Sequence, residues 1–206
     1  MKMKLTPVLL GIVLTAALIS CDESTNVISG DQSEWGEIGV VATSTNLPAV
    51  LQGGSAEITD LNGGVSTLTL TADFSDNDIA EIQERLPNFD GTSTFDAKYR
   101  VTSKGIQSVY DDGTSYTLVL YDAKVGDKWT LKRNGQNLVR EVTQKSTEDD
   151  YYWNGWLLKT ITVVETGRAV PGLQEAELVF NHRFGLVGYT LKFEDGSSES
   201  IPVVLQ

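Results

Sequence analysis

Strict alternation of apolar and polar residues is the feature that most constrains the fold of this chain. The alternation runs through 67–74, 95–102 and 187–194. Successive side chains of a β-strand point to opposite faces, so this pattern places one face of each strand on a core and the other in water. Strands that are buried on one face only are typical of antiparallel sheets.

Further strand candidates cover most of the chain after Trp35. They are 36–43, 115–122, 128–133, 137–145, 156–165, 175–182 and 199–205. Hairpin turns are indicated by Asp111-Asp112-Gly113, Asn134-Gly135 and Glu194-Asp195-Gly196, because Asn, Asp and Gly accept the positive φ of tight turns. We therefore predict an all-β, mainly antiparallel fold, either a sandwich or a curved, incomplete barrel.

One segment departs from the period of two. Polar residues suited to a helix N-cap occupy 75–78, and Ile79, Ile82 and Leu86 follow at helical spacing. A proline comes next and would stop a helix. We expect one short amphipathic helix over 77–86, packed on the sheet or closing one end of it.

The first residues have the layout of a secretory signal. Lys2 and Lys4 precede an uncharged, mostly apolar run over 5–20, which is shorter than the roughly 20 residues of a spanning helix. The run ends in Leu18-Ile19-Ser20-Cys21, which resembles the lipobox of bacterial lipoproteins. The resemblance implies that cleavage falls directly before Cys21, that its thiol receives a diacylglyceryl group, and that the new amine can be acylated, for example with palmitate.

These features divide the chain into three parts. Residues 1–20 form a signal peptide, 21–34 a polar lipidated tether, and 35–206 a single β-rich domain. Cys21 is the only cysteine, so the mature domain has no disulfide to support it.

The charge of the mature chain excludes several partners. Removal of residues 1–20 takes away two lysines and no acid, leaving 14 basic residues against 28 acidic ones. Such a surface repels nucleic acid and anionic lipid headgroups. The acyl chains must therefore attach the protein to the membrane.

The residue after the lipidated cysteine bears on location. Asp22 resembles the inner-membrane retention signal of enteric bacteria, whereas acidic residues at this place are an outward-export feature in other Gram-negative groups. We expect a lipid-anchored protein of a Gram-negative-type cell envelope. The choice of membrane stays open, with the outer membrane favoured.

Residue types needed for catalysis are scarce. His182 is the only histidine and lies between Phe180 and Phe184, which indicates a place near a strand end and not a metal or triad site. Phosphate-binding and dinucleotide-binding motifs are missing from the sequence, so we expect no cofactor and no metal.

Paired carboxylates are the remaining enzymatic route. Candidates are Asp111, Asp112, Glu148, Asp149, Asp150, Glu194 and Asp195. All lie in hydrophilic turns, where a solvated acid keeps an ordinary pKa and makes a poor proton donor. We therefore predict no catalytic residue and no enzyme.

The candidate binding residues are Tyr151, Tyr152, Trp153 and Trp156, four aromatics within six positions. Exposed, they would form a platform for a sugar or a protein partner. Paired across two strands, they would instead plug the sheet. We expect Trp156 in the core, because it leads into the alternating strand that follows, and Trp153 at the surface among turn residues.

Three functions remain. The first is a non-catalytic, membrane-anchored domain that binds an amphiphile or a glycan. The second is a structural or assembly subunit that pairs with another envelope protein, and the third is a carboxylate-based hydrolase. The expected architecture is loosely similar to β-rich envelope lipoproteins, including carriers of acyl chains, but fold alone does not assign a function.

Overall fold

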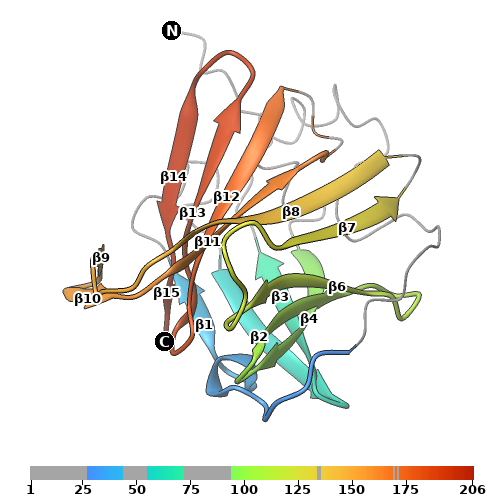
Figure 1. Cartoon of the computed structure of the whole chain (residues 1–206). Coiled ribbons are helices and arrows are strands. Elements are labelled where there is room, and N and C mark those ends of the chain that lie inside the picture. The colour runs from blue at the N-terminus through green and yellow to red at the C-terminus, as the bar shows by residue number, and fades with distance from the viewer. Residues whose placement is uncertain (1–26, 44–54, 72–93, 134–135, 169, 171) are drawn as a thin grey trace, which may run out of the picture.

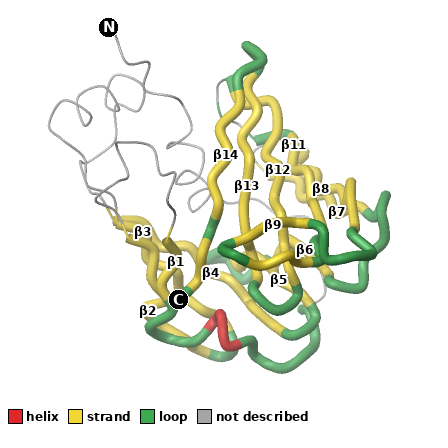
Figure 2. The backbone as a smooth tube through the Cα atoms, turned by 90° about the vertical axis from the view of Figure 1, so that its left-hand side faces the viewer, coloured by secondary structure: helices red, strands yellow, loops and turns green. Residues whose placement is uncertain are grey.

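The chain folds into two large antiparallel sheets and one small hairpin sheet (Figures 1 and 2). The computed structural model describes residues 27–43, 55–71, 94–133, 136–168, 170 and 172–206. The prediction of an all-β, mainly antiparallel fold is confirmed, and the one helical element among these residues is a 3₁₀ turn, η2 (Glu34–Gly36). The helix predicted at 77–86 lies outside the described residues.

Sheet A has seven strands. In spatial order they are β15 (Val204–Leu205), β1 (Val41–Thr43), β2 (Ser55–Asn62), β3 (Val65–Thr71), β4 (Thr94–Thr102), β5 (Gly105–Val109) and β6 (Ser115–Leu120).

Sheet B has six strands. In spatial order they are β14 (Ser198–Pro202), β13 (Gly185–Phe193), β12 (Leu173–Asn181), β11 (Ile161–Thr166), β8 (Gln136–Lys145) and β7 (Lys128–Arg133). A third, two-stranded sheet pairs β9 (Tyr151–Trp153) with β10 (Trp156–Leu158).

Two chain connections link the sheets at their edges. β14 ends at Pro202 and β15 starts at Val204, so the chain passes from sheet B to sheet A through Val203. At the opposite edges, β6 runs on to β7. There the Tyr116 hydroxyl donates to the carbonyl oxygens of Trp129 and Leu138, at 3.2 and 3.0 Å. The two sheets therefore enclose one interior.

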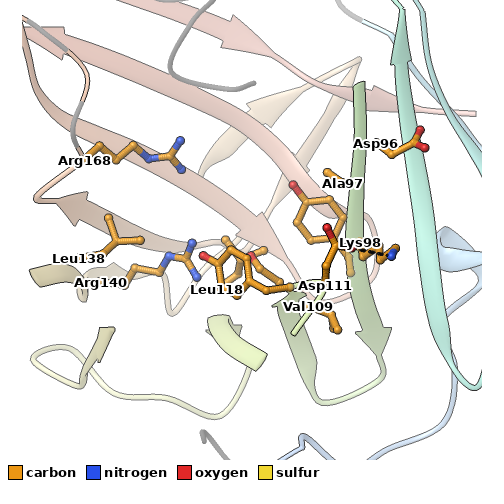
Figure 3. A pocket seen from close by; sticks show the side chains of 12 residues that line it. Asp96, Ala97, Lys98, Val109, Asp111, Leu118, Leu138, Arg140 and Arg168 are labelled. Atoms are coloured by element: carbon orange, nitrogen blue, oxygen red, sulfur yellow. Dashed lines mark hydrogen bonds and ion pairs between the residues drawn. The ribbon is translucent and has the colours of Figure 1, made fainter. Parts of the chain in front are cut away.

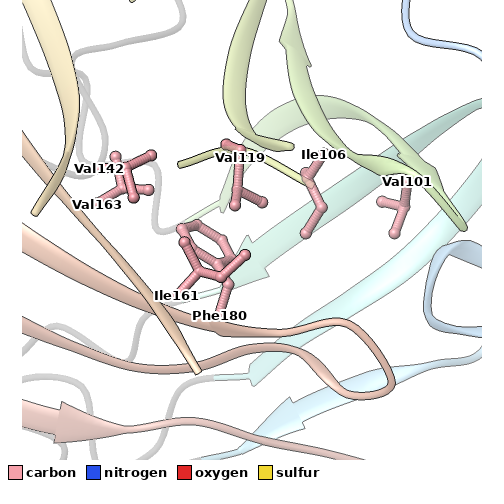
Figure 4. Packing of buried hydrophobic residues seen from close by; sticks show 8 residues of the cluster. Val101, Ile106, Val119, Val142, Ile161, Val163 and Phe180 are labelled. Atoms are coloured by element: carbon pink, nitrogen blue, oxygen red, sulfur yellow. The ribbon is translucent and has the colours of Figure 1, made fainter. Parts of the chain in front are cut away.

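The main core fills the space between the sheets (Figure 4). Its apolar residues come from the inward positions of both sheets. They are Val101, Ile106 and Val119 from sheet A, and Val142, Ile161, Val163 and Phe180 from sheet B. Burial of these side chains is the main favourable contribution to folding.

The chain is attached to sheet A before Trp35, where we expected the domain to begin. The Ile28 amide donates to Gln107 Oε1 at 3.0 Å, and the Ser33 amide donates to the carbonyl oxygen of Val101 at 3.0 Å. Contacts with the fold thus begin within the segment expected to be a tether.

Candidate ligand-binding cavity

The aromatic segment singled out in the sequence forms a hairpin of its own. β9 and β10 pair Trp153 with Trp156 and Tyr152 with Leu157. Asn154 and Gly155 connect them with φ of 41° and 87°, the positive values required by a tight two-residue turn. β10 ends at Leu158, so the single strand expected over 156–165 is two strands in different sheets.

The prediction that Trp156 is buried and Trp153 is exposed is wrong, because the structure shows the reverse. Trp153 is 6% exposed and donates its Nε1 hydrogen to the carbonyl oxygen of Val203 at 2.7 Å. Its ring lies 4.7 Å from that of Phe184. Trp156 is 66% exposed. The reason is the chain break after Leu158, which separates Trp156 from the core strand that it was expected to begin.

The four aromatics do not form one platform. Tyr151 is half-buried and packs with Trp153 against sheet B, where its hydroxyl lies over Gly188. A Cβ at Gly188 would lie 2.8 Å from that hydroxyl oxygen, so the glycine leaves room for the tyrosine. Tyr152 and Trp156 remain exposed.

The carboxylates considered for catalysis lie in exposed turns, as expected. Asp111 pairs with Lys98 at 2.7 Å, and Asp112 accepts the Thr114 amide at 2.8 Å. Asp195 accepts the Ser197 amide at 2.9 Å. Among these acids only Asp111 lines the cavity described below, so no two of them meet there as a catalytic pair.

The single histidine lies at the surface. His182 directly follows the end of β12 and is exposed, which confirms its place near a strand end. The single cysteine, Cys21, lies outside the described residues. Among the described residues, no group of His, Cys, Asp and Glu side chains could hold a metal ion.

A cavity of about 260 Å³ lies where β4–β6 of sheet A meet β8 of sheet B. No residue of the aromatic hairpin lines it. Its polar lining consists of Asp96, Lys98, Tyr99, Ser108, Tyr110, Asp111, Arg140 and Arg168. Its apolar lining consists of Ala97, Val109, Leu118 and Leu138. Figure 3 shows Arg140 and Arg168 reaching from one side of the cavity toward Ala97 and Lys98 on the other.

One buried and one partly buried arginine share one carboxylate beside this cavity. Arg140 Nε donates to Glu165 Oε2 at 2.5 Å, and Arg168 Nε donates to the other carboxylate oxygen, Oε1. Glu165 is fully buried. The cluster therefore holds two positive charges and one negative charge in the interior of a strongly acidic protein.

The pKa directions follow from this arrangement. Burial acts to raise the pKa of Glu165, but the guanidinium groups of Arg140 and Arg168 outweigh it and hold the pKa below its ordinary value. Burial acts to lower the pKa of Arg168, and Glu165 reverses this and raises it. Glu165 and Arg168 are therefore both charged at neutral pH.

Strand register and one glycine bring the cluster together. Arg140 of β8 lies directly opposite Glu165 of β11, so both side chains point to the inner face. Gly167 then turns the chain with φ of 85°, and a Cβ there would lie 2.0 Å from the carbonyl oxygen of Asn137. Only glycine permits this close turn, which returns Arg168 to Glu165.

The two arginines have different roles. Arg140 is 3% exposed, and its Nη1 group donates to the carbonyl oxygens of Tyr116 and Thr117, which ties β8 to the edge strand β6. Arg168 is 18% exposed and faces the cavity. A guanidinium presents a fork of donors that matches a carboxylate, phosphate or sulfate.

The rim of the cavity carries the remaining charges. Lys98 and Asp111 both line the cavity and form an exposed ion pair (Figure 3), and the hydrogen bond between them raises the pKa of Lys98. Asp96 accepts a hydrogen bond from the Thr69 hydroxyl at 2.7 Å. The lining thus places Arg140 and Arg168 on the side of sheet B, and the mixed charges of Asp96, Lys98 and Asp111 on the side of sheet A.

Sequence reasoning missed this cavity although a signal for it was present. In the strands predicted at 137–145 and 156–165, Arg140 shares the inward phase of Leu138 and Val142, and Glu165 shares that of Ile161 and Val163. A charged residue at an inward position of a strand, among apolar residues, is buried together with a group of opposite charge. No local pattern, however, shows which strands will lie side by side.

Comparison with known proteins adds no relative. No protein-family model matches the sequence, and neither the curated proteins nor the solved structures contain a significant match. Among the described residues, no helix has the length and apolar character needed to cross a membrane.

Proposed function

We propose that this chain is a lipid-anchored envelope protein whose β domain binds a small amphiphile with an acidic head group, without catalysis. The observation that carries the proposal is the guanidinium of Arg168, held in place by Glu165 on the wall of the inter-sheet cavity. The acidic head group lies against Arg168, and the apolar part lies against Leu118 and Leu138.

Electrostatics support an anionic head group. The buried cluster has one more positive than negative charge, and an anion brought beside it interacts strongly because the surroundings exclude water. A cationic ligand would meet the same excess charge as repulsion. The apolar side chains that share the cavity favour an amphiphile over a fully hydrated ion or a glycan.

Isothermal titration calorimetry with octanoate, octanol and octylamine tests the proposal. We expect octanoate to bind most tightly and octylamine least. Arg168→Gln should weaken octanoate binding by at least roughly tenfold, which corresponds to about 1.4 kcal/mol. Lys192→Gln is the matched control, because Lys192 is paired with Glu175 and Glu177 away from the cavity. Equal affinity for octanoate and octanol would contradict the proposal.

The anchor rests on the lipobox and has its own test. Cys21→Ala removes the thiol that accepts the lipid, so we expect an unprocessed precursor that takes up no labelled palmitate. Incorporation of label into the Cys21→Ala protein at the wild-type level would exclude Cys21 as the site of lipidation.

A further inference from the structure

We propose that the β9–β10 hairpin is a docking edge that takes an extended, basic segment of a partner protein. This inference concerns a second surface and does not depend on the cavity. It rests on three properties of the hairpin: its exposed apolar side chains, its unpaired strand edges and the acidic residues at its base.

Three large side chains of the hairpin are exposed, and two of them lie side by side. Tyr152 and Leu157 face each other across the two strands and are 74% and 58% exposed. Trp156 is paired with Trp153, so it lies on the opposite face of the hairpin, and it is 66% exposed. Tryptophan and tyrosine are the residues that most often dominate the free energy of protein association. Neighbouring exposed apolar side chains, such as Tyr152 and Leu157, mark an interaction surface more often than single ones do.

The face of the hairpin that carries Trp153 and Leu158 packs against the rest of the fold. Trp153 and Leu158 are buried in a cluster with Val179 and Val187. The hydrogen bond from Trp153 to the carbonyl oxygen of Val203 fixes the hairpin to the corner between sheets B and A. A preorganised surface loses little conformational entropy on binding, which favours affinity.

The strand edges are available for pairing. β9 and β10 pair only with each other among the described strands, and the hairpin projects from the side of the two large sheets (Figure 1). An extended segment can therefore add to either edge through backbone hydrogen bonds.

Charge decides which segment fits. Glu148, Asp149 and Asp150 are exposed and directly precede β9, and the whole chain carries a net charge of −12. A second copy of this chain would bring like charges together at the hairpin. Lysine and arginine side chains would instead pair with the carboxylates and lie over the rings of Tyr152 and Trp156.

Calorimetry with a synthetic probe tests the inference. The probe is an octapeptide of alternating valine and lysine, and its control is the same peptide with glutamate in place of lysine. We expect saturable binding of the basic peptide, slower amide hydrogen exchange in β9 or β10 on binding, and no binding of the acidic peptide.

Two variants with matched controls locate the contact. Trp156→Ala should weaken binding of the basic peptide at least roughly tenfold, while Ile38→Ala, at another exposed apolar residue, should leave it unchanged. The variant E148Q/D149N/D150N should also weaken it. Its control, E37Q/D122N/E194Q, neutralises three other exposed acids and should bind like wild type.

Several outcomes would overturn the inference. They are failure of the wild-type protein to bind the basic peptide, equal weakening by both triple variants, and hydrogen-exchange protection confined to sheets A and B. Self-association in analytical ultracentrifugation that Trp156→Ala abolishes would assign the hairpin to a second copy of the chain. Binding to phosphatidylcholine vesicles that Trp156→Ala abolishes would assign it to a membrane.

Discussion

Glu165 is the residue on which the interior charge balance depends. It accepts hydrogen bonds from Arg140 and Arg168, and all three side chains are largely withdrawn from water. Removing one member of a buried ion cluster leaves charge without compensation, which costs more than the cluster itself contributes. By contrast, the exposed pair of Lys98 and Asp111 is of the kind that contributes little.

The variant Glu165→Gln tests the cost of removing one charge from this cluster. The substitution keeps the side-chain shape and leaves two buried guanidinium groups facing a neutral amide. We expect a loss of about 3–5 kcal/mol in the free energy of unfolding, measured by urea titration at neutral pH. Lys98→Met should cost less than about 1 kcal/mol in the same measurement. Equal losses would show that the cluster is not a buried, coupled unit.

The same variant tests a pH dependence. The pKa of Glu165 in the folded protein lies below the ordinary value of 4.5, so the folded state holds this proton less tightly than the unfolded chain. Its contribution to stability is therefore complete above pH 4.5 and is lost as the pH falls through the folded pKa. Stability measured from neutral pH to about pH 3 should fall more steeply in wild type than in Glu165→Gln. If stability fell equally steeply with pH in both proteins, the lowered pKa of Glu165 would be contradicted.

At the scale of elements, alternation in the sequence predicted the regular strands and failed at the irregular ones. β4 and β13 follow the predicted pattern. β2 escaped prediction because a bulge between Ile58 and Asp60 moves the next inward position to Leu61. β5 escaped because its central residue, Gln107, is polar and yet fully buried.

Alternation also failed to predict which tryptophan of the hairpin is buried. Substituting each of the two tryptophans tests the burial seen in the structure. Trp153→Ala should cost about 3–5 kcal/mol, because a buried indole and its hydrogen bond to Val203 are lost. Trp156→Ala should change stability by less than about 0.5 kcal/mol, because the side chain is exposed. Urea titration of both variants measures the difference. A larger loss of stability in Trp156→Ala than in Trp153→Ala would contradict the burial described for this hairpin.

At the scale of the whole molecule, the cavity depends on how segments that are distant in the sequence meet. Arg140 and Arg168 come from sheet B and the loop after it, whereas Tyr99 and Leu118 come from sheet A. The sequence predicts the strands that carry most of these residues but not the pairing order of the sheets. That order is set by the packing of the shared core, so the cavity could not be located from local patterns.

The inter-sheet cavity, with Arg168 on its wall, is the site that we propose receives an acidic amphiphile. The most direct measurement is two-dimensional NMR of the protein during titration with octanoate, observing the Arg168 Nε–H, the methyl groups of Leu118 and Leu138, and the indole N–H of Trp156. We expect saturable shifts at Arg168 and both leucines and none at Trp156. Shifts confined to Trp156, or no saturable shift at Arg168, would contradict the proposed site.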